Sequence, residues 1–200
     1  MIVLLDNGHG GLINGEYTTP GKRKDWGDQG IIFEGEFNRA IVNGIIEQLT
    51  YLKIPYVNIA PEYRDVRLKT RVNRANKYSG SNCFYLSIHS NAGGGNGCEF
   101  FTSPGVTGSD KIASLFGEEY QKEFPNHRLR ADYSDGDIDK ERRFYVLMNT
   151  IMPALLTENF FMDNIEEFKN ILNSKQGRQK IINYHINAII RVKQEVFNEA

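Results

Sequence analysis

Two histidines of this chain stand in the same kind of position, one near its start and one near its middle. His9 follows the apolar residues 3–5 and His89 follows the apolar residues 84–86, and each leads into a segment rich in glycine and asparagine. In open α/β sheets, ligands collect beyond the carboxyl ends of the strands, so histidines that end two strands can converge on one cleft. Imidazole is the commonest metal ligand, but a histidine after a strand is also an ordinary hydrogen-bonding loop residue. The residues alone leave both interpretations open.

A carboxylate is the expected third ligand, because two histidines and one glutamate form a usual catalytic zinc set that leaves the fourth position to water. Glu34 and Glu36 stand at the start of the first predicted amphipathic helix. Acidic residues in the first turn also complement the helix dipole. Each glutamate therefore has a structural and a metal-binding interpretation.

Glu158 directly follows the apolar, strand-like residues 153–157. Hydrolysis of an amide needs a base to take a proton from water and an acid to protonate the leaving nitrogen, and one carboxylate can do both in turn. A charge at the end of a buried strand is costly unless it is paired or lies near a metal. The structural alternative for Glu158 is a salt bridge with an arginine such as Arg143.

Helices and strands must position these side chains, and the two alternate along the sequence. Hydrophobic periodicity predicts strands over residues 2–5, 56–60, 83–89, 98–102, 144–147 and 153–157, and helices over 37–52, 68–75, 112–120, 165–172 and 178–197. This order predicts a single-domain α/β fold over residues 1–200, similar to phosphorylase/hydrolase-like folds. Its mostly parallel, twisted sheet has about six strands and carries helices on both faces.

Two long stretches resist regular structure, and we expect them to border the cleft or to act as lids. The first covers residues 10–31 and includes Tyr17 and Trp26, which could stack on sugar rings or pin the loop. The second covers residues 127–143 and carries four aspartates: Asp132, Asp135, Asp137 and Asp139.

Arg67, Arg71 and Arg74 form a basic stripe on the second predicted helix. We expect a solvated or ion-paired face there, with contact to acidic peptide groups as the alternative.

The composition excludes several classes of partner. The net charge is −1, which gives no general attraction for nucleic acid or an anionic membrane surface. No apolar run approaches the 18 or so residues of a membrane span, and the first residues lack the pattern of a signal peptide. Cys83 and Cys98 are the only cysteines and are expected to be buried hydrophobes. We expect a monomer without an export signal or a membrane anchor.

Several motifs together resemble one family of enzymes. The order and spacing are similar to those of the zinc-dependent N-acetylmuramoyl-L-alanine amidases of the amidase_3 type. The motifs are Asn7-Gly8-His9-Gly10-Gly11, then Glu34 four residues before Asn38, Ser87-Ile88-His89-Ser90-Asn91-Ala92, and Pro153-Ala154-Leu155-Leu156-Thr157-Glu158 with Phe161 and Asn164. The sequence departs from the family pattern at Asn7 (often Pro), Arg39 (usually Leu), Phe160 (commonly Gly) and Asp163 (frequently Ser or Thr).

The resemblance implies one Zn²⁺ ion, with His9, Glu34 and His89 as ligands and Glu158 as the catalytic base and acid. Its implied substrate is peptidoglycan, cleaved at the amide between the lactyl group of N-acetylmuramic acid and L-alanine of the stem peptide. Asp6 is a candidate to orient one imidazole, because metal-bound histidines generally donate their other N–H to a carboxylate or carbonyl. The alternative for Asp6 is a strand-end turn residue.

Two other functions fit the same residues. One is a zinc carboxypeptidase or deacylase that acts on another amide, and the other is a non-catalytic cell-wall binding module of the same fold. The implied place of action is the cell wall or periplasm, reached by a phage or prophage endolysin made in the cytoplasm or by a bacterial enzyme exported by other means.

Overall fold

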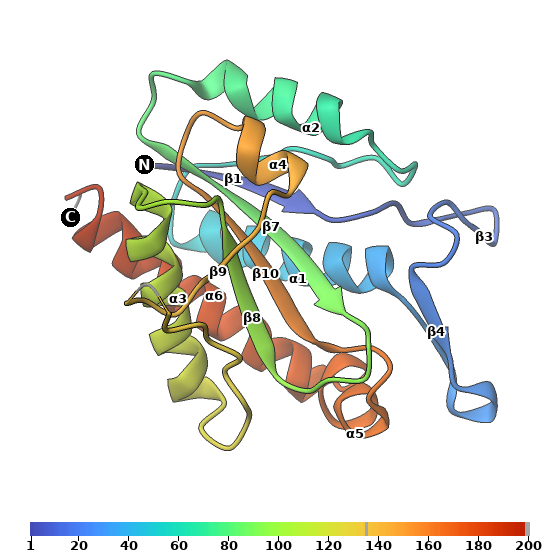
Figure 1. Cartoon of the computed structure of the whole chain (residues 1–200). Coiled ribbons are helices and arrows are strands. Elements are labelled where there is room, and N and C mark those ends of the chain that lie inside the picture. Colours follow the sequence, from blue (N-terminus) through green and yellow to red (C-terminus); the bar gives the residue numbers. More distant parts are fainter. Residues whose placement is uncertain (135, 199–200) are drawn as a thin grey trace.

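A six-stranded sheet forms the centre of the computed structural model, which describes residues 1–134 and 136–198 (Figure 1). The strand order is β6-β1-β7-β10-β8-β9. The strands are β1 (Ile2–Asn7), β6 (Tyr56–Asn58), β7 (Cys83–Asn91), β8 (Cys98–Thr102), β9 (Lys140–Glu141) and β10 (Ala154–Phe161). Every neighbouring pair is parallel except β8 and β10, which are antiparallel. The predicted α/β class, with a mostly parallel sheet of about six strands, is therefore confirmed.

Helices cover both faces of the sheet, as predicted. One face carries α1 (Glu34–Tyr51), α3 (Gly108–Glu123) and α6 (Lys175–Glu195), and the other carries α2 (Leu68–Ala75) and α4 (Tyr145–Asn149) (Figure 1). Alternate residues of a strand point to opposite faces. Val3 and Leu5 of β1 accordingly belong to the larger core under α1, α3 and α6, whereas Leu4 belongs to the smaller core under α2 and α4.

The chain positions its helices with local signals. In α1, Phe37, Ile41, Ile45 and Leu49 recur every four residues and are buried. The N-terminus of α3 is fixed by a capping box, in which Thr107 and Asp110 satisfy each other's backbone N–H groups. The long α6 begins after Ser174, whose hydroxyl accepts a hydrogen bond from the N–H of Gly177.

Two sequence-based expectations for secondary structure are wrong. Residues 144–147, predicted as a strand, belong instead to α4 and its N-cap. A short apolar run has no clear period, and here Val146 and Leu147 are buried by packing as one helical turn on the α2 side of the sheet. The stretch 10–31 contains three short strands and the start of a fourth, which pair as two hairpins: β2 (Leu12–Ile13) with β3 (Glu16–Tyr17), and β4 (Arg23–Asp25) with β5 (Ile31–Phe33).

The remaining elements are short. Single turns occur at Gly27–Gln29, Asn76–Tyr78 and α5 (Ile165–Glu167), which runs into a turn at Phe168–Leu172. Of the acidic stretch 127–143, Asp135 lies outside the described residues, as do residues 199–200. Cys83 and Cys98 are buried and free, as predicted. Among the described residues, no helix is both long and apolar enough to span a membrane.

β10 contains a bulge between Glu158 and Phe161, and Phe160 within it has a φ of 62°. This left-handed conformation suits glycine, which explains why glycine is the residue expected there from the sequence resemblance. Phe160 is nevertheless fully buried, and its ring packs 4.9 Å from that of Phe124 between centroids. The packing of a large aromatic side chain therefore offsets a strained backbone.

Phe160→Gly is expected to be more stable than Phe160→Ala, the reverse of the usual order. Either change removes buried aromatic packing, at about 3–5 kcal/mol. Only glycine also relieves the left-handed strain, which costs an L-residue about 1–2 kcal/mol. Denaturant unfolding of both variants measures the difference. Phe116 in α3 is an equally buried control, where alanine must exceed glycine by about 1 kcal/mol. The same order at both positions would contradict the strain argument.

Candidate metal centre and catalytic cleft

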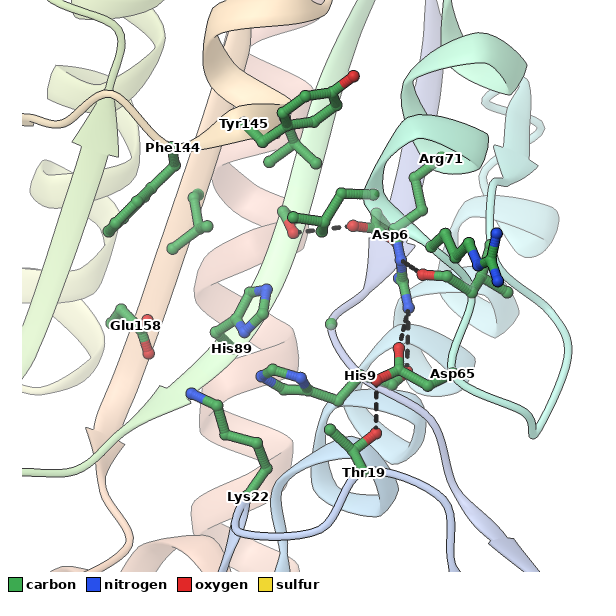
Figure 2. A pocket seen from close by; sticks show the side chains of 17 residues that line it. Asp6, His9, Thr19, Lys22, Asp65, Arg71, His89, Phe144, Tyr145 and Glu158 are labelled. Atoms are coloured by element: carbon green, nitrogen blue, oxygen red, sulfur yellow. Dashed lines mark hydrogen bonds and ion pairs between the residues drawn. The ribbon is translucent and has the colours of Figure 1, made fainter.

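The carboxyl ends of β1, β7 and β10 meet at one edge of the sheet, where a cavity of about 610 Å³ opens (Figure 2). Parallel pairing aligns Asn7 with Ile88 and Glu158 with His89, so residues far apart in sequence arrive together. The cavity is lined by polar and aromatic side chains that include His9, Lys22, Arg67, His89, Phe144, Tyr145 and Glu158.

A second cavity of about 570 Å³ adjoins the first, and Lys22 and Glu158 line both. Its walls are more polar and include three consecutive basic residues, Lys22, Arg23 and Lys24. The two cavities meet at these two side chains, and we call them together the groove.

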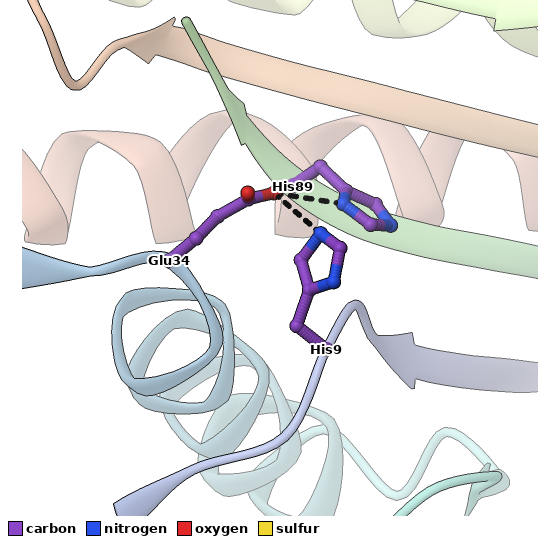
Figure 3. A group of neighbouring side chains, drawn as sticks. All are labelled: His9, Glu34 and His89. Atoms are coloured by element: carbon purple, nitrogen blue, oxygen red, sulfur yellow. Dashed lines mark hydrogen bonds and ion pairs between the residues drawn. The ribbon is translucent and has the colours of Figure 1, made fainter. Parts of the chain in front are cut away.

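His9, Glu34 and His89 converge at this edge (Figure 3). His9 lies in the loop after β1, Glu34 is the first residue of α1, and His89 lies two residues before the end of β7. Oε1 of Glu34 is 3.1 Å from Nε2 of His9 and 2.9 Å from Nδ1 of His89. One potential ligand atom from each residue lies within 4.8 Å of the others.

This donor set fits a zinc ion. Ligand atoms about 2.0–2.1 Å from a tetrahedral Zn²⁺ are about 3.3 Å from one another, close to both distances from Glu34 Oε1. Glu34 is buried, and burial alone would raise its pKa. Hydrogen bonds from His89 and His9 prevail and hold the pKa of Glu34 well below its usual range, so the group is a carboxylate.

The two glutamates that the sequence left open have different surroundings. Oε1 of Glu36 accepts a hydrogen bond of 2.6 Å from the backbone N–H of Leu12. Glu36 thus closes the first hairpin onto α1, whereas Glu34 faces the imidazoles.

The turn that carries His9 depends on close backbone approach. His9 itself has a left-handed φ of 68°. A Cβ atom on Gly8 would lie 2.0 Å from Cε1 of His89, so only glycine lets the end of β1 pass this ring. Asn38 donates a hydrogen bond of 2.9 Å to the carbonyl of Gly8. The position of the turn is therefore set by α1 and by the His89 ring together.

Arg71 holds the same turn from the other side. Its guanidinium donates to the carbonyls of Asn7 (2.8 Å) and His9 (3.2 Å) and to the carboxylate of Asp6. Asp6 also accepts hydrogen bonds from Tyr85 (2.6 Å) and Ser87 (3.0 Å). Among the described residues these are the side-chain hydrogen bonds of Asp6, so its direct contact with the turn is made through Arg71.

The three arginines of the basic stripe have different surroundings in the structure. Arg74 is ion-paired with Glu62, at 2.8 Å between Nη1 and Oε2, which agrees with the expected ion-paired face. Arg67 is exposed and lines the first cavity. Arg71 is different, because only 2% of its side chain is exposed.

Glu158 lies in β10 directly beside His89 and opposite Glu99 of β8. Burial, and then the charge of Glu34, raises the pKa of Glu158 well above its usual value, against a smaller effect of Lys22. Its Oε2 is buried and has no hydrogen-bond partner among the described residues. Among the residues that the structure describes, Arg143, the expected alternative partner, forms no ion pair with Glu158.

The loop that covers the second cavity is pinned to the rest of the domain. Nε1 of Trp26 donates to the carbonyl of Met162 (3.1 Å), and the hydroxyl of Tyr17 accepts from the N–H of Gly35 (2.8 Å). Glu34 N–H donates to the carbonyl of Lys22 (2.9 Å). Of the two roles open to these aromatic residues, the contacts support pinning.

The sequence analysis assigned no positioning role to three residues that have one in the structure: Asn38, Arg71 and Asn159. Asn159 donates a hydrogen bond of 3.0 Å to the carbonyl of His89, as Asn38 does for Gly8. The sequence signal for the two asparagines is their proximity to a candidate glutamate. Asn38 lies about one helical turn after Glu34, and Asn159 directly follows Glu158. Arg71 gives no such signal, because the residues it holds at the turn, Asp6, Asn7 and His9, are more than 60 positions away.

Comparisons with known proteins agree with this geometry. Residues 3–191 match the family model described as N-acetylmuramoyl-L-alanine amidase. The chain is 31% identical over 190 residues to the N-acetylmuramoyl-L-alanine amidase CwlM of Bacillus licheniformis, covering 94% of this chain and 67% of that protein. It is 34% identical over 134 residues to the sporulation-specific N-acetylmuramoyl-L-alanine amidase of Bacillus subtilis, covering 66% of this chain and 47% of that protein.

The fold is similar to solved structures as well. The crystal structure of an N-acetylmuramoyl-L-alanine amidase from Clostridium difficile 630 superposes with a TM-score of 0.76 at 22% identity, over 97% of both chains. The chain spans about two thirds of the length of one curated relative and about half of the other. Because the family match extends over nearly all of its residues, the chain belongs to the family of N-acetylmuramoyl-L-alanine amidases.

Proposed function

We propose that this protein hydrolyses the amide between the lactyl group of N-acetylmuramic acid and L-alanine in peptidoglycan. His9, Glu34 and His89 would hold one Zn²⁺ ion, and Glu158 would transfer the protons. The observation that carries the proposal is the convergence of two imidazoles on one oxygen of Glu34, inside the groove that Glu158 lines.

When bound, zinc supplies a Lewis acid that polarises the scissile carbonyl and lowers the pKa of water to about 7. Glu158 takes the proton of the attacking water and passes it to the leaving nitrogen of L-alanine. Its unpartnered Oε2 is free to accept that proton, and the raised pKa suits its second role as an acid. Arg71, Asn38 and Asn159 keep the two histidines in place by holding the backbone of each.

The shape of the cleft favours a bond within a polymer. Glu158 lines both cavities, so a substrate that occupies the two of them extends beyond the bond that is cut. A carboxypeptidase requires a closed end that binds a terminal carboxylate. In a non-catalytic module, the buried, unpaired oxygen of Glu158 would cost stability without a catalytic benefit. The carboxypeptidase and the non-catalytic module are therefore less well supported than the amidase, whereas a deacylase acting on another amide is distinguished only by its substrate.

The decisive experiment uses purified peptidoglycan and zinc-loaded protein. We expect new amino termini on L-alanine, no release of D-alanine and no new reducing sugar ends, together with one zinc per chain by elemental analysis. Removal of the metal with a chelator must abolish the release, and added zinc must restore it. Release of D-alanine would identify a carboxypeptidase, and absence of any product would refute the catalytic proposal.

Lys22→Met is expected to raise the KM for stem peptides with free carboxylates by about 2–5-fold, the size of a partly exposed charge contact. The ammonium group lies 3.9 Å from Glu34 Oε2 and faces both cavities, where it can bind an acidic peptide. Kinetics on free and amidated stem peptides at low and high salt give the measurement, since only the charged contact is screened. Lys77→Met, at an exposed position outside both cavities, is the matched control. An equal change on both substrates would exclude a role in carboxylate binding.

We also propose that residues 1–200 form one catalytic domain, active as a monomer on the cell wall. The two hydrophobic cores share the same sheet, which supports a single folding unit. Sedimentation at several concentrations tests the monomer. An endolysin role remains a prediction from the sequence.

A further inference from the structure

Three aspartates form a second cluster at the other end of the sheet from the metal centre. Asp110 lies in the first turn of α3, and Asp137 and Asp139 precede β9. One carboxylate oxygen from each residue lies within 4.8 Å of the others. Thr102, which contacts Asp139, ends β8, and β8 runs antiparallel to β10, so the cluster is far from the carboxyl end that holds Glu158.

Asp139 provides a separate observation that points to a ligand. Only 2% of this residue is exposed. Its Oδ2 accepts a hydrogen bond from the hydroxyl of Thr102, whereas its Oδ1 is buried and has no hydrogen-bond partner among the described residues. A buried carboxylate oxygen without a partner is costly, because it has lost its water and gained nothing in return.

Basic residues close in sequence do not neutralise the cluster. Lys111 pairs with Glu195 (3.6 Å), Lys140 with Glu99 (2.6 Å), and Arg142 donates to the carbonyl of Glu141 (2.9 Å). Burial, followed by the carboxylates of Asp137 and Asp110, raises the pKa of Asp139 to about 7. Three carboxylates therefore face one another without a compensating charge among the described residues.

We propose that Asp110, Asp137 and Asp139 bind one Ca²⁺ ion, which ties residues 136–141 to the start of α3. Calcium binds oxygen ligands in a flexible geometry, whereas Mg²⁺ demands a near-ideal octahedron and usually keeps several of its waters. Three carboxylates from two separate segments therefore suit calcium better. Asp110 caps α3 through Thr107, but each carboxylate oxygen has two lone pairs and can also bind a metal. Water completes the coordination.

Calorimetric titration with CaCl₂ tests this site directly, with zinc-loaded protein from which unbound metal has been removed. We expect one Ca²⁺ per chain and an increase in Tm. At a hundred times its Kd, a ligand raises the Tm of a domain of this size by about 5–10 °C. Asp137→Asn and Asp139→Asn are each expected to weaken binding at least tenfold. Asp132→Asn, an exposed change in the same acidic stretch, is the control and must leave binding intact.

The readouts do not involve amidase activity, so they are independent of the proposed zinc centre. If Asp139→Asn does not fold, the partly buried Asp137 still carries the comparison with Asp132. Failure of the wild-type protein to bind Ca²⁺ at millimolar concentration overturns the proposal. So does binding that Asp137→Asn leaves unchanged.

Discussion

Glu158→Gln is expected to lower kcat by about 10²–10⁴-fold, the usual contribution of a general acid and base. Glutamine keeps the size and shape of the side chain but cannot take a proton from water or return it to the leaving nitrogen. Glu158 is not among the three residues that we propose as zinc ligands, so the zinc content must stay at the wild-type level. Single-turnover release of L-alanine amino termini, with zinc measured on the same sample, gives the result.

Glu99→Gln is the matched control for this change. Glu99 lies opposite Glu158 in the antiparallel pair and is buried, but Arg130 and Lys140 neutralise it at 2.6 Å. Its replacement is expected to cost stability and to spare kcat. Glu158→Gln is expected to lower kcat and, in the zinc-free protein, to raise the free energy of unfolding, because burial of this carboxylate opposes its ionisation. Full activity in Glu158→Gln would show that another group transfers the protons.

The pH dependence of stability separates the two glutamates further. A carboxyl group whose pKa is raised by folding binds its proton more tightly in the folded state, so its contribution to stability is lost as the pH rises. That is the sign for Glu158, whereas the lowered pKa of Glu99 gives stability that is lost as the pH falls. Glu158 is thus held at a cost to the fold, which is the pattern expected from the catalytic role that we propose for it.

The order of strands and helices was predictable from the sequence because periodicity reports burial directly. Val3, Leu4 and Leu5 read as a continuous apolar run, and the structure buries them on both faces of the sheet. The same reasoning failed for α4, where four apolar residues are too few to distinguish a period of two from one of 3.6.

The candidate site was predictable only in part, because sequence position does not report long-range contacts. His9 and His89 could be placed at one sheet edge by the parallel topology. The choice between Glu34 and Glu36 depended on a resemblance, since both lie in the same helical turn and only the structure shows where each points. Arg71 belongs to a polar, charged stripe by pattern, yet the carboxylate of Asp6 draws it into the interior.

Gly8→Ala is expected to weaken zinc affinity by about 10–100-fold or more, the cost of disturbing what orients a metal-binding imidazole. The new Cβ would lie 2.0–2.5 Å from Cε1, Nε2 and Nδ1 of His89, so the ring has to leave its present position. Asn38 holds the carbonyl of Gly8, which prevents the backbone from moving away instead. Competition with a chromophoric zinc chelator measures the affinity.

Gly44→Ala separates this effect from a loss of stability. Its Cβ would lie 2.3 Å from Cδ1 of Ile182, where α1 packs on α6, so it strains the core without contact with either histidine. Both variants are expected to have a lower Tm, but only Gly8→Ala should lose zinc affinity. Because the clash in Gly8→Ala falls on the ring of His89, wild-type affinity in that variant would mean that His89 is not a ligand. The pair of variants therefore tests the assignment of His89 without removing the imidazole itself.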